Sequence, residues 1–307
     1  MKKDITTLTD LNKDDCMMLF SLAADLKARA AKGIYDALLA GRVLGLLFDK
    51  PSTRTRVSFE AAMYKMGGAT LYMSAKDMQI SRAEPVKDTA RVLSRYIDVL
   101  AIRTYSQELI ETYSAYAGIP VINALSDLYH PCQVLSDLMT VIEQKGGLDG
   151  VHVAWVGDGN NVANSWINAC SILGFDLTLA CPDAYQPDAS ILDNARQSGI
   201  GNIHITNDPE AAVANANVIY TDVWASMGQE EEQAIRQQQF APFQVNEKLV
   251  AMATPDVIVM HCLPAHRGEE IEEAVLEGPK SVVWAQAENK MHMHKAILKA
   301  LIENNMK

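Results

Sequence analysis

The chain has 307 residues, of which 49% are hydrophobic and 21% charged, a composition typical of a globular protein with two ordinary domains. Its formal net charge of −11 argues against a general nucleic-acid or membrane-surface role, so any anion site must be built locally. The sequence contains no apolar run long enough for a membrane span, and its N-terminus lacks the apolar core of a signal peptide. The five scattered cysteines, without a CxxC pair, are typical of free thiols in a reducing cytoplasm.

The first half of the chain alternates between strand and helix patterns. Apolar runs of strand length occur at 43–48, 69–74, 99–104 and 120–124. Helical patterns separate them, for example over 85–98 and 107–118. Strands that alternate with helices predict a parallel sheet with helices on its faces.

A long helical pattern over 131–146 interrupts this alternation, with Pro131 in its first turn and two glycines at its end. Six more strand candidates follow at 151–159, 177–182, 203–206, 218–224, 257–264 and 281–287. We therefore predict an α/β protein with two doubly wound parallel-sheet lobes joined by the long helix. The expected lobes are 1–134 and 135–287, and a helix over 288–305 closes the chain. The polar segment 226–246 is compatible with a mobile active-site loop or with a solvated helix.

The stretch FDKPSTRTRVSFE, residues 48–60, gathers hydroxyl groups and cations directly after an apolar strand. Ser52 is a candidate N-cap, and the apolar residues after it recur at helical spacing: Val57, Phe59, Ala62, Met63 and Met66. A helix N-terminus at a sheet edge favours an anion, and Arg54 and Arg56 add planar forks suited to phosphate. A purely structural cap would favour acidic residues in this turn, so we interpret the stretch as a phosphate site. It is not a P-loop, because GxxxxGK[ST] is absent.

Four motifs then point to one family. STRTR (52–56), HPCQ (130–133), DVWASMG (222–228) and HCLPAHR (261–267) resemble the aspartate/ornithine carbamoyltransferase family in order and spacing, and SMG with HCLP is similar to its ornithine-specific members. The resemblance implies transfer of the carbamoyl group of carbamoyl phosphate to the side-chain amine of L-ornithine, giving L-citrulline and phosphate. It implies no cofactor and no metal, and a cytoplasmic homotrimer, or a multiple of trimers, acting in arginine biosynthesis. It also implies that the first lobe binds carbamoyl phosphate, the second binds ornithine, and the C-terminal helix 288–307 packs on the first lobe.

The resemblance assigns most carbamoyl phosphate contacts to the first lobe. The matching residues are Ser52, Thr53, Arg54 and Thr55 for the phosphate, Gln79 from a neighbouring subunit, Arg103, His130 and Gln133 for the carbonyl oxygen, and Pro131, Cys132, Cys262, Leu263 and Lys290. From the residues alone, Arg103 is equally compatible with a salt bridge, and a lone histidine such as His130 is more often structural. The family usually has arginine where this chain has Lys290, which keeps the charge but loses the bidentate fork.

The resemblance places the acceptor in the second lobe. Asn161, Asp222, Ser226 and Met227 match the ornithine-binding residues, and Asp222 with Cys262 matches the pair that orients and deprotonates the amine. A buried inert thiol is the alternative for Cys262. A cis peptide is expected at Leu263-Pro264. His261 and His266 suggest a metal pair, but the sequence offers no further ligand at helical spacing.

Three rival functions remain open from the sequence. Another carbamoyltransferase would act on aspartate, putrescine or an acylated ornithine. A nicotinamide dehydrogenase is suggested faintly by VGDGNN, although Val162 stands at the third glycine position of GxGxxG. A catalytically inactive binding protein is disfavoured because nearly every motif residue is present.

Overall fold

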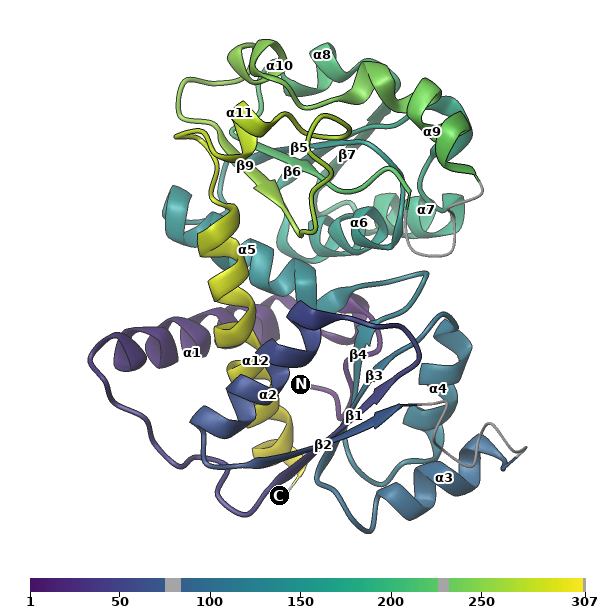
Figure 1. Ribbon diagram of the computed structural model, residues 1–307, viewed down its shortest axis with the longest axis vertical. Helices are drawn as coiled ribbons and strands as arrows, with labels where there is room; N and C mark the ends of the chain where they lie inside the picture. The colour runs from purple at the N-terminus through teal and green to yellow at the C-terminus, as the bar shows by residue number, and fades with distance from the viewer. Residues whose placement is uncertain (75–83, 226–231, 306–307) are drawn as a thin grey trace. The chain divides into compact units, whose positions relative to one another are not determined.

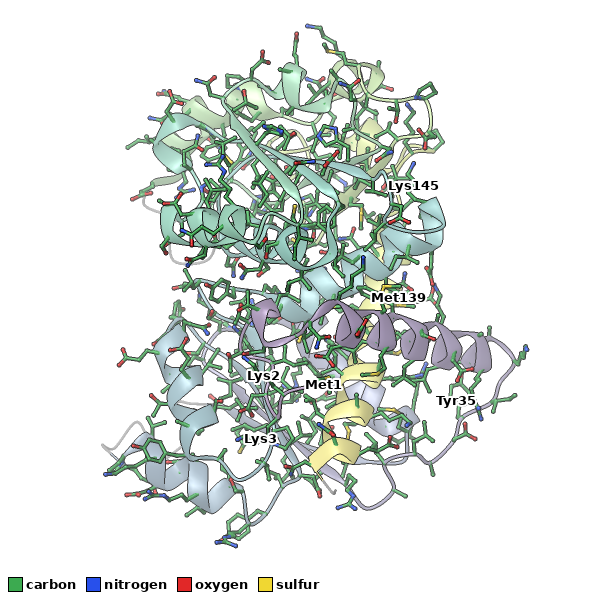
Figure 2. All side chains as sticks on the ribbon, turned by 180° about the vertical axis from the view of Figure 1, so that it is seen from behind. Met1, Lys2, Lys3, Tyr35, Met139 and Lys145 are labelled. Carbon is green, nitrogen blue, oxygen red and sulfur yellow. The ribbon has the colours of Figure 1, made fainter. Side chains whose placement is uncertain are left out.

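The computed structural model describes residues 1–74, 84–225 and 232–305, and it divides into two compact units. Unit 1 comprises Met1–Met139 and Asn289–Lys307, and unit 2 comprises Thr140–Glu288. Both divisions fall inside long helices, one of which, α5 (Pro131–Lys145), carries Met139 and Lys145 (Figure 2). None of the helices in the described part of the chain has the length and apolar character that a membrane span requires.

Unit 1 contains a four-stranded parallel sheet in the order β2-β1-β3-β4 (Figure 1). Its strands are β1 (Val43–Phe48), β2 (Ala69–Ser74), β3 (Val99–Arg103) and β4 (Val121–Leu125). The helices α3 (Val86–Leu93) and α4 (Gln107–Tyr116) cover one face, and α1 (Lys13–Ala31), α2 (Thr53–Lys65) and most of α12 (Val283–Asn305) cover the other. The short helix η1 (Leu8–Asp10) precedes α1. The first two predicted strands match the observed bounds residue for residue.

The C-terminal helix packs on unit 1, as the resemblance implied. The His294 ring of α12 stacks on Phe59 of α2 with centroids 3.6 Å apart, and its Nδ1 lies 3.0 Å from the Ser58 hydroxyl. Apolar side chains such as Ile297 and Leu301 of the same helix are buried. This packing holds α12 against α2, the helix that Ser52 caps.

Unit 2 contains a five-stranded parallel sheet in the order β7-β6-β5-β8-β9 (Figure 1). Its strands are β5 (His152–Val156), β6 (Asp176–Ala180), β7 (Asn202–Thr206), β8 (Val218–Thr221) and β9 (Ile258–His261). The helices α6 (Asn161–Leu173) and α7 (Ala189–Ser198) cover one face, and α8 (Pro209–Val213) and α10 (Glu247–Ala251) cover the other. The remaining helices are η4 (Asp183–Tyr185), α9 (Gln233–Phe240), η6 (Ala241–Phe243) and α11 (Glu273–Leu276).

The predicted sixth strand of the second lobe, 281–287, is wrong. Main-chain hydrogen bonds join Val259 of β9 to Lys280 and Val282. They form an isolated bridge between Val259 and Ser281 and not a strand. The chain then turns directly into α12 at Val283. Its β-branched start resembles a strand, but the run AQAENKMHMH that follows favours a helix, and the helix extends back to include it.

Two smaller predictions concern the polar segment 226–246 and the residue Val57. The polar segment 226–246 contains a helix, α9, over Gln233–Phe240, while 226–231 lies outside the described residues. Of the apolar residues whose spacing predicted α2, Val57 is 55% exposed, whereas the others are buried.

Candidate functional site

Each sheet has one position where its strand order reverses, and several of the predicted site residues lie at the strand ends beside it. In unit 1 the chain runs from β1 to β2 and then returns to β3 on the other side of β1. In unit 2 it runs from β5 outward to β6 and β7 and returns to β8 beside β5. Open α/β sheets bind ligands at the carboxyl ends of strands at such points. Ser52–Arg56 follow β1, Arg103 ends β3, and Asp222 follows β8.

The start of α2 is a capped helix N-terminus without an acidic side chain. Ser52 caps the helix in an extended conformation, and its hydroxyl accepts a hydrogen bond from the Thr55 N–H over 3.2 Å. The first turn of α2 is fully described and contains no acidic residue, so its positive end is not neutralised from within the helix. The hydroxyl of Thr55 is buried, whereas Thr53 and Arg54 are exposed.

The two arginines of this turn are placed differently. Arg56 Nε lies 3.0 Å from Glu60, and its guanidinium stacks 3.7 Å from the centre of the Tyr72 ring. For Arg54 no ion-pair partner is found among residues 1–74, 84–225 and 232–305. Of the two forks predicted for phosphate, that of Arg54 is therefore the better placed to bind a ligand.

A second group of polar side chains in unit 1 is buried and includes two cations. Arg103, His130 and Lys290 are between 5% and 7% exposed and come from β3, the turn before α5, and α12. Burial, together with the charges of Lys290 and Arg103, holds the pKa of His130 well below its usual range. His130 is therefore a neutral donor and acceptor at pH 7.

The HPCQ motif begins α5 and connects to α12. Pro131 is the first residue of α5. Lys290 donates a 2.6 Å hydrogen bond to the side-chain oxygen Oε1 of Gln133. The Cys132 thiol donates to the Asn123 carbonyl oxygen over 3.4 Å, and burial raises the pKa of Cys132 to about 12. Cys132 is thus a packed, protonated thiol, while the Gln133 amide belongs to the polar cluster.

Lys50, which lies two residues after the end of β1 and before the Ser52 turn, was not among the predicted site residues. Lys50 is 5% exposed, and its ammonium forms an ion pair with Asp127 and lies 4.0 Å from the centre of the Tyr105 ring. A lysine between a buried strand and a helix cap was the available signal. Its partners, however, are 55 and more residues away in sequence and could not be predicted.

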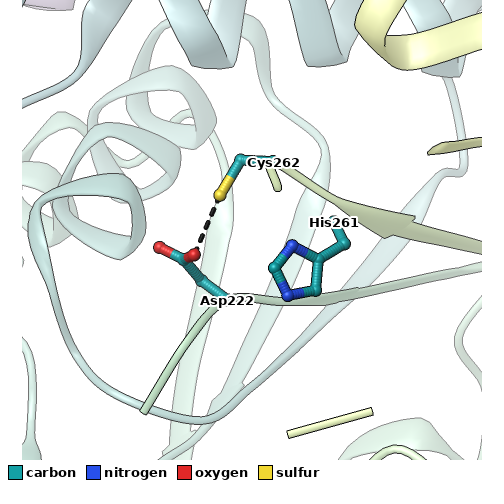
Figure 3. Close-up of side chains that lie close together, drawn as sticks. All are labelled: Asp222, His261 and Cys262. Carbon is teal, nitrogen blue, oxygen red and sulfur yellow. Dashed lines mark hydrogen bonds between the residues drawn. The ribbon is translucent and has the colours of Figure 1, made fainter. Parts of the chain in front are cut away.

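In unit 2 the register of the sheet brings two predicted residues together. Thr221 of β8 pairs with His261 of β9, so the next residues along each strand, Asp222 and Cys262, lie side by side (Figure 3). The Cys262 thiol donates to Asp222 Oδ1 over 2.9 Å, and the Val223 N–H donates to the same oxygen over 2.8 Å. Asp222 is only 7% exposed, so a carboxylate is held at the strand ends by directed donors.

Asn160 completes this group and was not predicted. Its Nδ2 donates to Asp222 Oδ2 over 2.8 Å, while its Oδ1 accepts from the N–H groups of Val162 and Ala163. The predicted residue, Asn161, is the first residue of α6. Because the cap uses two free N–H groups of α6, this helix start has less capacity for a phosphate than that of α2.

Gly159 of VGDGNN also has a structural explanation. A Cβ on Gly159 would lie 2.3 Å from the Pro187 nitrogen and 2.4 Å from the Gln186 carbonyl carbon. The close approach of that backbone requires glycine here without any dinucleotide. This disfavours the dehydrogenase alternative.

A buried histidine supports the HCLP turn. His261 Nδ1 accepts from the Leu263 N–H over 2.9 Å, and His261 Nε2 lies 3.0 Å from Glu270 Oε1. The Leu263-Pro264 peptide is cis, as predicted, and Leu263 has a φ of 59°. Two groups of side chains in the described residues, Asp222–His261–Cys262 and His266–Glu269–Glu270, are spaced closely enough to hold a metal ion. Both ring nitrogens of His261 are used by protein partners, which argues against a ligand role for it.

Three predicted site residues, Gln79, Ser226 and Met227, lie outside the described residues. Arg236 of α9 forms a buried ion pair with Asp158, to which it donates over 2.9 Å. It also donates to the main-chain oxygen of Trp224 over 2.7 Å, two residues before Ser226 in the sequence. Burial raises the pKa of Asp158 to about 6 against the opposing charge of Arg236.

Comparisons with known proteins agree along the whole chain. Residues 3–143 match the family model "Aspartate/ornithine carbamoyltransferase, carbamoyl-P binding domain", and 149–301 match the "Asp/Orn binding domain" of the same family. An ornithine carbamoyltransferase from Desulfotalea psychrophila is 54% identical over 302 residues, covering 98% of this chain and 100% of that protein. One from Geobacter sulfurreducens is 51% identical, covering 99% and 100%.

Solved structures give the same result for the fold. Ornithine carbamoyltransferase from Pyrococcus furiosus is 49% identical with a TM-score of 0.92, covering 96% of this chain and 95% of that one. The anabolic enzyme from Campylobacter jejuni is 38% identical with a TM-score of 0.92, covering all of both chains.

Proposed function

Since this chain belongs to the aspartate/ornithine carbamoyltransferase family, we propose that it is an ornithine carbamoyltransferase acting in arginine metabolism. It transfers the carbamoyl group of carbamoyl phosphate to the side-chain amine of L-ornithine and releases L-citrulline and phosphate. The names of relatives about 50% identical over the full chain support this activity. Unit 1 holds the carbamoyl donor, and unit 2 holds the acceptor.

One observation supports an amine-bearing acceptor such as ornithine over aspartate. The acceptor residues of unit 2 centre on the buried carboxylate of Asp222, whose oxygens are oriented by Asn160, Val223 and Cys262. A carboxylate attracts an amine and repels the second carboxylate of aspartate. The family's ornithine set also includes Asn161, Ser226 and Met227, which suit an α-amino acid better than putrescine.

The reaction needs two kinds of charge control in unit 1. The phosphate is held by the N-terminus of α2 with Ser52, Thr53, Arg54 and Thr55, which stabilise charge on the leaving group. Arg103, His130 and Gln133 donate to the carbamoyl oxygen, which becomes an oxyanion when the amine attacks the carbon. Lys290, Pro131, Cys132, Cys262 and Leu263 complete the predicted carbamoyl phosphate contacts, with Gln79 from a neighbouring subunit.

The chemistry proceeds by addition and elimination. The ornithine amine loses a proton beside Asp222 and Cys262, and its nitrogen then forms a bond to the carbamoyl carbon. The attached nitrogen gives up its second proton, the bond from the carbamoyl carbon to the phosphate oxygen breaks, and the electron pair and that proton leave with the phosphate. A neutral His130 donates one hydrogen bond here without adding a third cation beside Lys290 and Arg103.

We further propose a homotrimer, or a multiple of trimers, in the cytoplasm, with the biosynthetic direction suggested by the anabolic relative. A panel of amine acceptors tests the function directly. With carbamoyl phosphate as donor, ornithine should give citrulline at least about tenfold faster than putrescine or aspartate reacts. Faster carbamoylation of putrescine would overturn the assignment.

A further inference from the structure

The side chain of Gln133 is held at its two ends by opposite charges. Lys290 Nζ donates to Gln133 Oε1 over 2.6 Å, and Gln133 Nε2 donates to Asp137 Oδ1 over 2.8 Å. Gln133 and Asp137 lie four residues apart on one face of α5, and Lys290 comes from α12. All three belong to unit 1, and their exposed fractions are 3%, 0% and 5%.

These partners fix which way the amide points. An ammonium group can only donate hydrogen bonds, and a carboxylate can only accept them. If the amide turned over, its NH₂ group would face the ammonium and its oxygen would face the carboxylate, which loses both bonds in a buried site. The orientation of Gln133 is therefore determined by Lys290 on one side and Asp137 on the other.

The same two bonds also polarise the amide in one direction. Lys290 stabilises negative charge on the oxygen, and Asp137 stabilises positive charge on the NH₂ group. Chains of this kind strengthen one another in a low-dielectric interior. The second N–H of Gln133 becomes a better donor, and the second lone pair of its oxygen a better acceptor.

We propose that Asp137 is a positioning residue for the carbamoyl group, acting through the Gln133 amide that it holds together with Lys290. This inference rests on the proposed function, since it assumes that Gln133 contacts the carbamoyl end of carbamoyl phosphate. The phosphate end is held elsewhere, at the start of α2. Disturbing Asp137 therefore weakens recognition of the carbamoyl group and not of phosphate.

Two ligands that differ only in the carbamoyl group separate these contributions. Isothermal titration of the full chain with carbamoyl phosphate and with inorganic phosphate gives both dissociation constants for each variant. Asp137→Asn keeps an acceptor but removes the charge, and should raise Kd for carbamoyl phosphate about tenfold, with Asp137→Ala larger. Kd for inorganic phosphate, and KM for ornithine, should stay within about twofold of wild type.

Ser136→Ala is the matched control. Ser136 is fully buried on the same helix, and its hydroxyl donates to the main-chain oxygen of Gln133 over 2.7 Å. Losing this bond should lower the unfolding temperature without changing the ratio of the two dissociation constants. If Asp137→Asn does not fold, Asp137→Glu, which displaces the carboxylate by one methylene, should show the same selective loss.

Equal weakening of carbamoyl phosphate and inorganic phosphate in Asp137→Asn would overturn the inference, because it would indicate a purely structural role. An unchanged Kd for carbamoyl phosphate would overturn it too. The proposed function fails in a different way: wild-type protein would then bind carbamoyl phosphate no more tightly than phosphate and form no citrulline.

Discussion

Unit 1 and unit 2 place a helix start at the same point of a parallel sheet but prepare it for opposite charges. In unit 1 the side chain of Ser52 accepts one N–H of α2, and Arg54 stands exposed in the first turn. In unit 2 the side chain of Asn160 accepts two N–H groups of α6 and passes its own amide to Asp222. The capping residue thus decides whether a helix N-terminus is available to an anion or supports a protein carboxylate.

The buried charges follow the same division. Unit 1 gathers Arg103 and Lys290 around a histidine whose pKa is depressed, an arrangement suited to a dianion and a developing oxyanion. Unit 2 presents Asp222 with a thiol donor, an arrangement suited to an amine.

The largest effect is expected from Arg54→Ala. Removing the fork at the start of α2 should lower kcat/KM for carbamoyl phosphate by at least about 10³-fold, because charge grows on the departing phosphate. Steady-state citrulline formation measures it. Arg56→Ala is the matched control: its guanidinium is already engaged by Glu60 and Tyr72, so its loss should cost less than about tenfold. Equal losses in the two variants would show that the two arginines have been distinguished wrongly.

Asp222→Asn should have the next largest effect, on the other substrate. The amide keeps the shape but removes the charge that attracts the amine, and kcat/KM for ornithine should fall about 10²-fold. Varying ornithine at saturating carbamoyl phosphate measures the change. Asp188→Asn, which caps α7 of the same unit, should leave the value unchanged. If kcat/KM for ornithine in Asp222→Asn equals that of wild type, the proposed role of Asp222 in acceptor binding is wrong.

A smaller effect concerns stability. Burial holds the pKa of His294 well below its usual range, with Lys290 contributing in the same direction. Native His294 therefore excludes a proton that the unfolded chain binds below about pH 6.5, so stability present above that pH is lost on acidification. This group alone should cost up to about 2 kcal/mol between pH 7 and pH 5.

His294→Gln tests this by removing the titration. Urea unfolding at pH 7 and pH 5 should show a smaller loss on acidification for the variant than for wild type, whatever its stability at pH 7. The difference between the two pH values is the informative quantity, because the substitution also removes the stacking on Phe59. Identical losses in both proteins would show that native His294 titrates normally.

Most helices and strands could be predicted from the sequence, because their formation depends on the pattern of residues that are close in sequence. The apolar runs at 43–48 and 69–74 fixed two strands, and Ser52 identified the cap of α2. The prediction of a strand at 281–287 was wrong because Val282 and Val283 favour a strand locally. Whether they form one depends on where the longer helix α12 begins, and it begins at Val283. Bridge pairing with Val259 could not be foreseen from that segment alone.

The site was predictable where a motif carried it, and less so where contacts are distant in sequence. Asp222 and Cys262 were paired by resemblance, and the register of β8 and β9 explains their contact. Asn161 was predicted by resemblance, whereas the bond from Asn160 to Asp222 depends on the cap geometry of α6 and could not be foreseen from the sequence. The bond from Lys290 to Gln133 joins residues 157 positions apart, and no local pattern contains it.

The most direct test of the division of labour between the units is calorimetric titration of carbamoyl phosphate into wild type, Arg54→Ala and Asp222→Asn. The comparison predicts that Arg54→Ala loses most of its affinity, while Asp222→Asn keeps the wild-type dissociation constant within about twofold. A loss of carbamoyl phosphate affinity in Asp222→Asn as large as that in Arg54→Ala would contradict it.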